Sequence, residues 1–92
     1  MTKLSDAEIA TKLLSLPAWK VEAGELVRTL AFENFLEALH FVNQVGSLAE
    51  AVGHHPDIDI RYNKVRLGLT THDAGGLTLK DFNLAAGIDQ MA

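Results

Sequence analysis

Two adjacent histidines are the residues of this 92-residue chain best suited to chemistry at neutral pH. His54 and His55 lie in the stretch GHHPDIDIRY, directly before Pro56 and an alternating segment typical of a β-strand. An imidazole whose pKa has its ordinary value of about 6.5 gains and loses protons near neutral pH. The pair therefore has three interpretations: solvated surface side chains, ligands of a metal ion, or proton carriers.

A third histidine joins them if two alternating segments form a hairpin. DIDIRY (57–62) and VRLGLTT (65–71) both alternate polar and apolar residues, and Asn63 and Lys64 between them predict a two-residue turn. The resulting pairs are Tyr62 with Val65, Ile60 with Leu67 and Ile58 with Leu69. This register places all the large apolar side chains on one face of the hairpin.

Extending this register outward predicts where the histidines meet. The extension pairs Pro56 with Thr71 and places His55 opposite His72, on the face that points away from the core. Opposed side chains of an antiparallel pair have Cβ atoms roughly 4.5–5.5 Å apart. Histidines that are distant in sequence are thus expected to converge at one end of the sheet.

Two carboxylates are expected at the same edge. Glu50 precedes His54 by four residues, and Asp81 follows His72 by nine. Each also has a simpler interpretation, because Asp81 can cap the helix that begins after Thr78, and Glu50 can be a solvated charge on a helix. The fourth histidine, His40, is expected to be a surface residue without a role.

Metal binding and nucleophilic hydrolysis fit these residues less well than proton transfer. Consecutive residues of a strand point to opposite faces, so His54 and His55 cannot easily hold one ion, and no HExxH spacing occurs. The chain has no Cys and no GxSxG serine, and Gly75-Gly76 lacks the spacing of a phosphate-binding loop. General acid–base catalysis by histidines, which needs no cofactor, is therefore favoured. A zinc site of three histidines and a carboxylate stays open as the minor alternative.

The surrounding elements that must position these residues are predicted from caps, turns and periodicity. A capping box predicts a helix from Ser5 that Pro17 ends, and WKVE (19–22) and ELVRTLAF (25–32) flank a short turn. Helical spacing of apolar residues predicts a long helix from Asn34 to Val52, stopped by Gly53, and Thr78 with Asp81 predicts a last helix start.

These elements predict one α+β domain over residues 1–92. The order is α-β-β-α-β-β-α, with a four-stranded antiparallel sheet covered by helices on one face. The other face is expected to be more polar and to carry Asp57, Asp59, Arg61, Arg66 and Thr70.

The charge and hydrophobicity of the chain limit the classes of partner that are expected. The formal charge is −4 and the eight Lys and Arg residues are scattered, so direct nucleic-acid binding is not expected. The N-terminal stretch lacks the apolar region of a signal peptide and no apolar run is long enough to span a membrane, which favours a cytoplasmic protein. A domain this small buries a limited core, so association into oligomers is expected.

The spaced residues resemble the signature of the pterin-4a-carbinolamine dehydratases. The signature is Glu50, three residues, His54-His55-Pro56, five residues, Tyr62, nine residues, His72, eight residues and Asp81. YNKV and THDAGGLT are similar to the same family, and the likeness extends over essentially the whole chain. The resemblance implies a lyase that dehydrates 4a-hydroxytetrahydropterin (4a-hydroxytetrahydrobiopterin in the recycling of tetrahydrobiopterin) to quinonoid dihydropterin after aromatic amino acid hydroxylation.

The resemblance also implies site roles and partners. His54 and His72 are expected to form the acid–base pair and His55 to position the pterin, with Glu50 and Asp81 orienting groups or contacting the ring. Pro56 and Thr71 are expected to contact the substrate beside them. No cofactor is implied, and family members are homodimers or homotetramers with a functional link to a pterin-dependent hydroxylase.

Two alternatives belong to other functional classes. An animal member of the family is also a dimerisation cofactor of a homeodomain transcription factor, so a protein-interaction module or coactivator is the main alternative. A pterin-binding protein linked to molybdenum cofactor metabolism is the other. The intact His54, His55 and His72 favour the enzyme.

Overall fold

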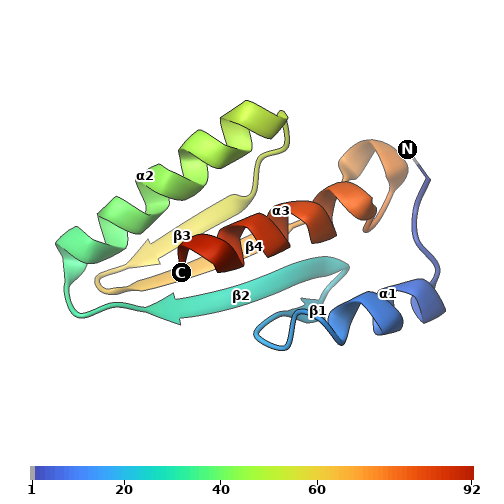
Figure 1. Ribbon diagram of the computed structural model, residues 1–92, viewed down its shortest axis with the longest axis horizontal. Coiled ribbons are helices and arrows are strands. Elements are labelled where there is room, and N and C mark those ends of the chain that lie inside the picture. The colour runs from blue at the N-terminus through green and yellow to red at the C-terminus, as the bar shows by residue number, and fades with distance from the viewer. Residues whose placement is uncertain (1) are drawn as a thin grey trace.

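The computed structural model describes residues 2–92, and within them the predicted order of elements is confirmed (Figure 1). The elements are α1 (Asp6–Leu13), β1 (Lys20–Glu22), β2 (Glu25–Ala31), α2 (Phe35–Val52), β3 (Asp57–Arg61), β4 (Lys64–Leu69), the 3₁₀ helix η1 (His72–Ala74) and α3 (Leu79–Met91). The short η1 was not predicted. No helix of residues 2–92 is long and apolar enough to cross a membrane.

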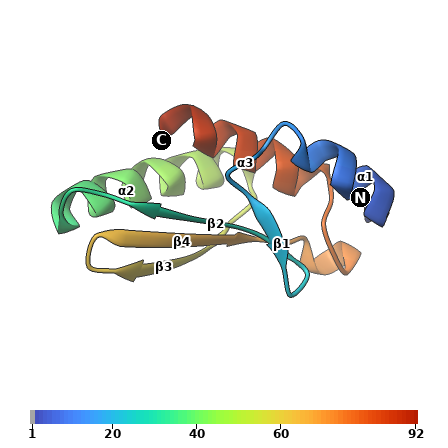
Figure 2. The ribbon, with the colours of Figure 1, turned by 90° about the horizontal axis from the view of Figure 1, so that it is seen from below.

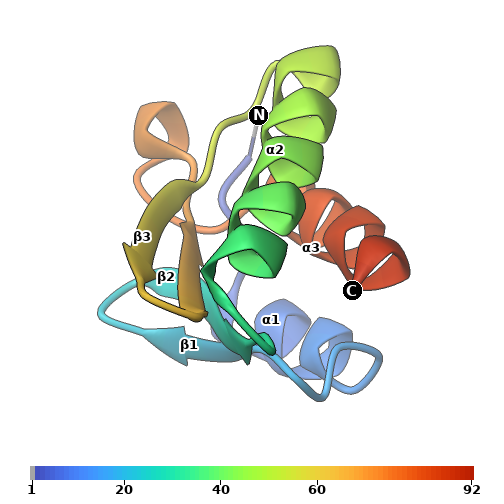
Figure 3. The ribbon, with the colours of Figure 1, turned by 90° about the vertical axis from the view of Figure 1, so that its left-hand side faces the viewer.

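The four strands form one antiparallel sheet in the order β1-β2-β4-β3, and the α+β fold class is confirmed. Figure 2 shows α1, α2 and α3 on one face of this sheet, and the end view in Figure 3 shows the other face uncovered. The core between the layers includes the fully buried Leu26, Leu67, Leu69 and Ile88. On the uncovered face, Asp57 and Asp59 are exposed, as the alternation predicted.

Capping residues set the helix ends much as predicted. Ser5 and Glu8 form the capping box of α1, and the backbone N–H of Ser5 together with its hydroxyl lowers the pKa of the Glu8 carboxyl. The helix ends at Leu13, however, because a tighter turn precedes Pro17. Gly53 ends α2 in the left-handed conformation, with φ of 67°.

The predicted register of the β3–β4 hairpin is wrong by two residues. The observed partners are Ile60 with Val65 and Ile58 with Leu67, because the turn contains Tyr62 and Asn63 rather than Asn63 and Lys64. Asn63 holds this turn against the end of β2: its side-chain amide donates to the carbonyl of Phe32 at 2.8 Å, and its own carbonyl accepts from the Phe32 N–H at 2.8 Å. A shift of two residues preserves the faces, so Val65, Leu67 and Leu69 of β4 face the core as expected, whereas Tyr62 lies in the turn and is 68% exposed.

Candidate active site

The three histidines singled out from the sequence line one cleft of about 320 Å³. The cleft lies where the end of α2, the loop after β4 and the start of α3 meet (Figure 1). Its lining residues are Gly53, His54, His55, Thr70, Thr71, His72, Asp73 and Lys80. The histidines are brought together by loops at this end of the sheet.

The predicted pairing of His55 with His72 across the hairpin is wrong. In the observed register Asp57 pairs with Gly68, so a continued ladder would place His55 beside Thr70. His72 lies two residues farther along, in η1, outside the strand. Pro56, which the same register paired with Thr71, is not among the residues that line the cleft.

Two local structures direct the histidines into the cleft. The left-handed Gly53 turns the chain sharply after α2, and the N–H of His54 still donates to the carbonyl of Ala49 at 3.1 Å. On the opposite wall, Thr71 and Gly76 are bridged by hydrogen bonds of 3.1 and 3.4 Å, which close a tight loop around His72. Both segments are held by backbone hydrogen bonds and leave their imidazoles free to face the cleft.

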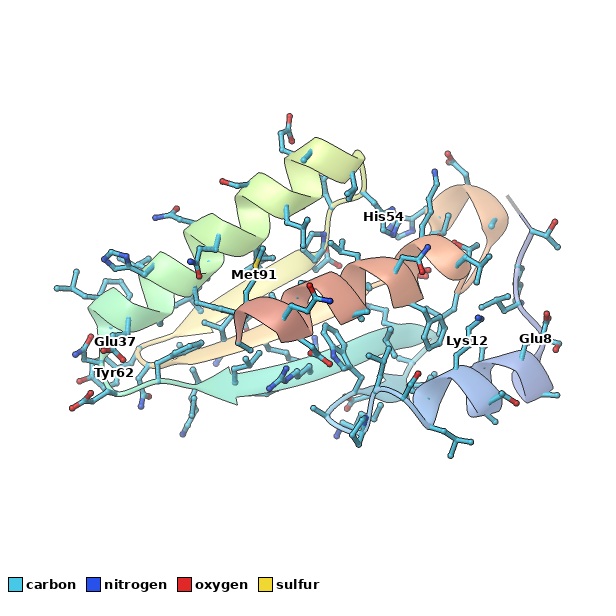
Figure 4. The ribbon with its side chains drawn as sticks, viewed as in Figure 1. Glu8, Lys12, Glu37, His54, Tyr62 and Met91 are labelled. Carbon is cyan, nitrogen blue, oxygen red and sulfur yellow. The ribbon has the colours of Figure 1, made fainter. Side chains whose placement is uncertain are left out.

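His54 forms a largely buried polar contact with Asp81. Its Nε2 lies 2.6 Å from Oδ1 of Asp81, with the imidazole side chain 12% exposed and the carboxylate fully buried. Figure 4 shows His54 extending from the segment after α2 toward the first turn of α3. Asp81 also accepts the N–H of Thr78 at 2.9 Å, so it both caps α3 and holds the histidine.

A chain of two hydroxyl groups supports Asp81 from behind. The Thr71 hydroxyl donates to Oδ2 of Asp81 at 2.9 Å and lies 2.8 Å from the Thr78 hydroxyl. Because Thr71 has only one hydroxyl proton, the Thr78 hydroxyl is the donor in the second contact. The hydroxyl of Thr71, expected to contact substrate, is thus directed at Asp81, and within residues 2–92 no buried side-chain polar atom lacks a partner.

This network determines which nitrogen of His54 is engaged by Asp81 and which is left free. An ionised Asp81 can only accept hydrogen bonds, so it receives them from Thr71, from Thr78 and from Nε2–H of His54. The second ring nitrogen, Nδ1, is then the one available to exchange a proton. Sequence reasoning interpreted Thr78 only as a helix cap, since nothing in its spacing indicates contact with Thr71.

His55 has a different environment. Its Nε2 lies 2.6 Å from Oε2 of Glu50, and the two side chains are 62% and 79% exposed. Glu50 therefore contacts His55 rather than His54. An exposed pair of this kind contributes only about 0–1 kcal/mol to stability, so it leaves His55 free to move toward a ligand.

Among residues 2–92, no three His, Cys, Asp or Glu side chains are arranged to hold a metal ion. The groups that do converge are imidazoles and a buried carboxylate. Lys80 also lines the cleft, and sequence reasoning missed it because it lies in the first turn of α3 without a distinctive spacing. Such a set can donate a proton at one point of a ligand and accept one at another.

Comparison with known proteins identifies the family. Residues 2–91 match the family described as Pterin 4 alpha carbinolamine dehydratase. A protein of Chloroflexus aurantiacus, provisionally named pterin-4-alpha-carbinolamine dehydratase, is 63% identical over 91 residues, which cover 99% of this chain and 98% of that protein. A protein of Acidobacterium capsulatum with the same provisional name is 56% identical over 91 residues, covering 99% of each.

Solved structures agree with the sequence comparison. The transcriptional coactivator/pterin dehydratase of Brucella melitensis superposes with a TM-score of 0.94 at 30% identity and covers 99% of both chains. A pterin dehydratase-like protein described as a RuBisCO assembly factor of the α-carboxysome shares the fold alone, with a TM-score of 0.66 at 23% identity over 80% of this chain and 86% of that one. The chain therefore belongs to the pterin-4-alpha-carbinolamine dehydratase family, a family of dehydratase enzymes, as its signature residues predicted.

Proposed function

We propose that this protein dehydrates 4a-hydroxytetrahydropterin to quinonoid dihydropterin and water, in the recycling of a tetrahydrobiopterin-type cofactor. The observation that carries the proposal is the hydrogen bond between His54 and the buried Asp81 in a cleft that His55 and His72 also line. Family membership supplies the pterin as the substrate class.

The reaction needs one proton donor and one proton acceptor. As the bond from C4a to the hydroxyl oxygen breaks, the electron pair leaves with oxygen, and an acid protonates it to water. The lone pair of N5 forms the C4a=N5 double bond, and a base removes the N5 proton. We assign these two roles to His54 and His72, because imidazoles serve as either acid or base near neutral pH and no other group is needed to balance the step.

The neighbouring residues support this pair. Asp81, with Thr71 and Thr78 behind it, fixes the orientation of His54 and leaves its Nδ1 toward the reaction. His55 positions the pterin ring, with Glu50 as its hydrogen-bonding partner. We also propose that Pro56, which follows His55 in the chain, and the backbone of Thr71 contact the substrate.

The decisive experiment is an assay of carbinolamine dehydration with the purified protein, coupled to a pterin-dependent aromatic amino acid hydroxylase. We expect turnover without added cofactor, and we expect chelator-treated protein to keep its rate, because proton transfer requires no metal. A rate lost to the chelator and restored by zinc would replace the acid–base mechanism with a metal-dependent one. We further propose that the protein acts together with such a hydroxylase. We propose the cytoplasm as the place where it acts.

We also propose that the domain of residues 1–92 works as a homodimer or homotetramer. Several large apolar side chains are exposed on α2, among them Phe35, Leu36 and Val52, and β1 and β3 are the two edges of the sheet. Burying such surfaces would add to the limited core of a small domain. Light scattering at micromolar concentration is expected to report more than one chain per particle, and a monomer of about 10 kDa would contradict this.

The same exposed apolar side chains of α2 are the observation that favours the second candidate, an interaction module. The Brucella melitensis structure is described as a transcriptional coactivator as well as a pterin dehydratase. A chain that folds but fails the dehydration assay would favour this role. A chain that binds pterins without converting them would instead favour a pterin-binding protein linked to molybdenum cofactor metabolism.

A further inference from the structure

A second cleft, of about 500 Å³, adjoins the cleft that the three histidines line, which we call the catalytic cleft. It lies between the start of α1, the β1–β2 turn and the loop at Gly75 and Gly76, and we name it the N-terminal cleft. Thr70 and His72 line both clefts, so His72 forms part of the wall between them. A ligand that reacts at His72 and extends beyond it would enter the N-terminal cleft.

The walls of the N-terminal cleft combine apolar and charged side chains. Ile9 and Val21 provide apolar surface, while Lys3, Asp6 and Glu25 provide charged groups. None of these three forms an ion pair with another residue of the described chain, 2–92. Two carboxylates against one ammonium favour a neutral ligand with hydroxyl donors over an anionic one.

The N-terminal segment closes this cleft against the loop that carries His72. The N–H of Leu4 donates to the carbonyl of Leu77 at 2.8 Å, and the aliphatic stem of Lys3 lies across Gly76. A Cβ atom added at Gly76 would come within 2.7 Å of Lys3 Cε, so a larger residue there would displace the lysine side chain from the cleft wall. The backbone hydrogen bond from Leu4 to Leu77 therefore fixes the N-terminal segment at the edge of this cleft.

The connectivity of the substrate puts its C6 substituent next to N5. In a 4a-hydroxytetrahydropterin, N5 is bonded to both C4a and C6, so a substituent on C6 begins two bonds from N5. A base within hydrogen-bonding reach of N5 is therefore next to the start of that substituent. With His72 as the base at N5, the substituent begins beside His72, which also lines the N-terminal cleft.

We infer that the N-terminal cleft binds the C6 substituent of the pterin, and that the cleft selects short hydroxylated alkyl chains. Asp6 and Glu25 accept hydrogen bonds from the hydroxyl groups, and the apolar wall at Val21 contacts the carbon chain. This inference rests on the proposed dehydratase function. It adds a preference among pterin substrates and names the residues that determine that preference.

The test compares two substrates that differ only at C6, the 4a-hydroxytetrahydropterins with a methyl and with a 1,2-dihydroxypropyl substituent. We expect the unmutated protein to have the higher kcat/KM for the dihydroxypropyl substrate. Glu25→Ala should reduce that advantage by about tenfold, the effect of one hydrogen bond to a charged group. Val21→Trp, which fills the cleft without changing its charge, should also reduce the advantage of the dihydroxypropyl substrate. Glu33→Ala, on the exposed loop before α2, is the matched control and should leave that advantage unchanged.

Binding of the stable 7,8-dihydropterins with the same two substituents, measured by fluorescence quenching, separates this inference from the proposed function. If turnover is absent but Glu25→Ala weakens binding of only the dihydroxypropyl ligand, the subsite is supported while the dehydratase proposal fails. If Glu25→Ala and Val21→Trp change kcat/KM and binding affinity equally for the methyl and the dihydroxypropyl ligands, the subsite is wrong even in an active enzyme.

Discussion

Replacing His54 or His72 with Ala is expected to lower kcat for carbinolamine dehydration by about 10²–10⁴-fold, the usual effect of losing one general acid or base. Both imidazoles line the catalytic cleft, and the reaction must deliver one proton and remove another. Steady-state kinetics over a range of substrate concentrations measures this directly. Water in the cleft can replace a missing proton carrier in part, which would bring the losses toward the lower end of the range.

The double variant tests whether the two histidines act as a unit. The effects of mutating groups that serve one step are strongly non-additive, so changing both histidines is expected to lower kcat by less than the product of the single losses.

His55→Ala should act more on KM than on kcat, because the exposed His55 is proposed to position the ring. His40→Ala on the exposed face of α2 is the matched control and should leave both constants unchanged. Undiminished turnover in both single variants, with folding confirmed by circular dichroism, would mean that the site is wrong.

The sequence predicted the fold well where the signal is local. Ser5 with Glu8 and Thr78 with Asp81 are short-range capping patterns, and both produce the helix starts expected from them. Alternation in the strands identified which side chains face the core, because a period of two is preserved under any even shift in register. The shift itself was missed because it depends on Asn63 bonding to Phe32, a residue 31 positions away.

The sequence predicted which histidines come together, but not the contacts that hold them. His54, His55 and His72 do line one cleft, yet loops rather than strand pairing bring them together. The partners of the carboxylates were also unexpected, since Glu50 contacts His55 and Asp81 contacts His54. Side-chain pairs of this kind depend on how the chain turns at Gly53 and Gly75, where left-handed backbone is allowed but its direction cannot be inferred from spacing.

Asp81→Asn is expected to lower kcat by about 10²–10⁴-fold while the protein stays folded. An asparagine has nearly the same shape, and its carbonyl oxygen can still accept from Thr71 and from the Thr78 N–H that caps α3. Its NH₂ group then faces His54 and donates to Nε2, which was formerly the donor. The hydrogen of the neutral imidazole must move to Nδ1, and the protonated imidazole that serves as the acid loses the carboxylate that stabilises it.

Nitrogen NMR of the imidazole distinguishes this tautomer change from general damage to the fold. The unmutated protein is expected to show Nε2–H in neutral His54, and Asp81→Asn is expected to show Nδ1–H. Glu50→Gln is the matched control: it makes the same change beside the exposed His55 and is expected to alter kcat far less, because exposed partners exchange readily with water. Retention of both the rate and the tautomer in Asp81→Asn would remove Asp81 from the mechanism.

The hydroxyls behind Asp81 extend the same argument to Thr71 and Thr78, whose hydroxyl groups contact each other and, from Thr71, Asp81. Thr71→Val keeps the volume of the side chain but removes the donor to Asp81 and the acceptor of Thr78, whereas Thr71→Ser keeps both. We expect Thr71→Val to lower the free energy of unfolding by about 1–3 kcal/mol, the cost of buried polar groups left unpaired, and to lower kcat through a less fixed His54. Because serine retains the hydroxyl, Thr71→Ser should restore the rate and the Nε2–H tautomer. A valine variant as active as the serine variant would show that Asp81 alone determines the orientation of His54.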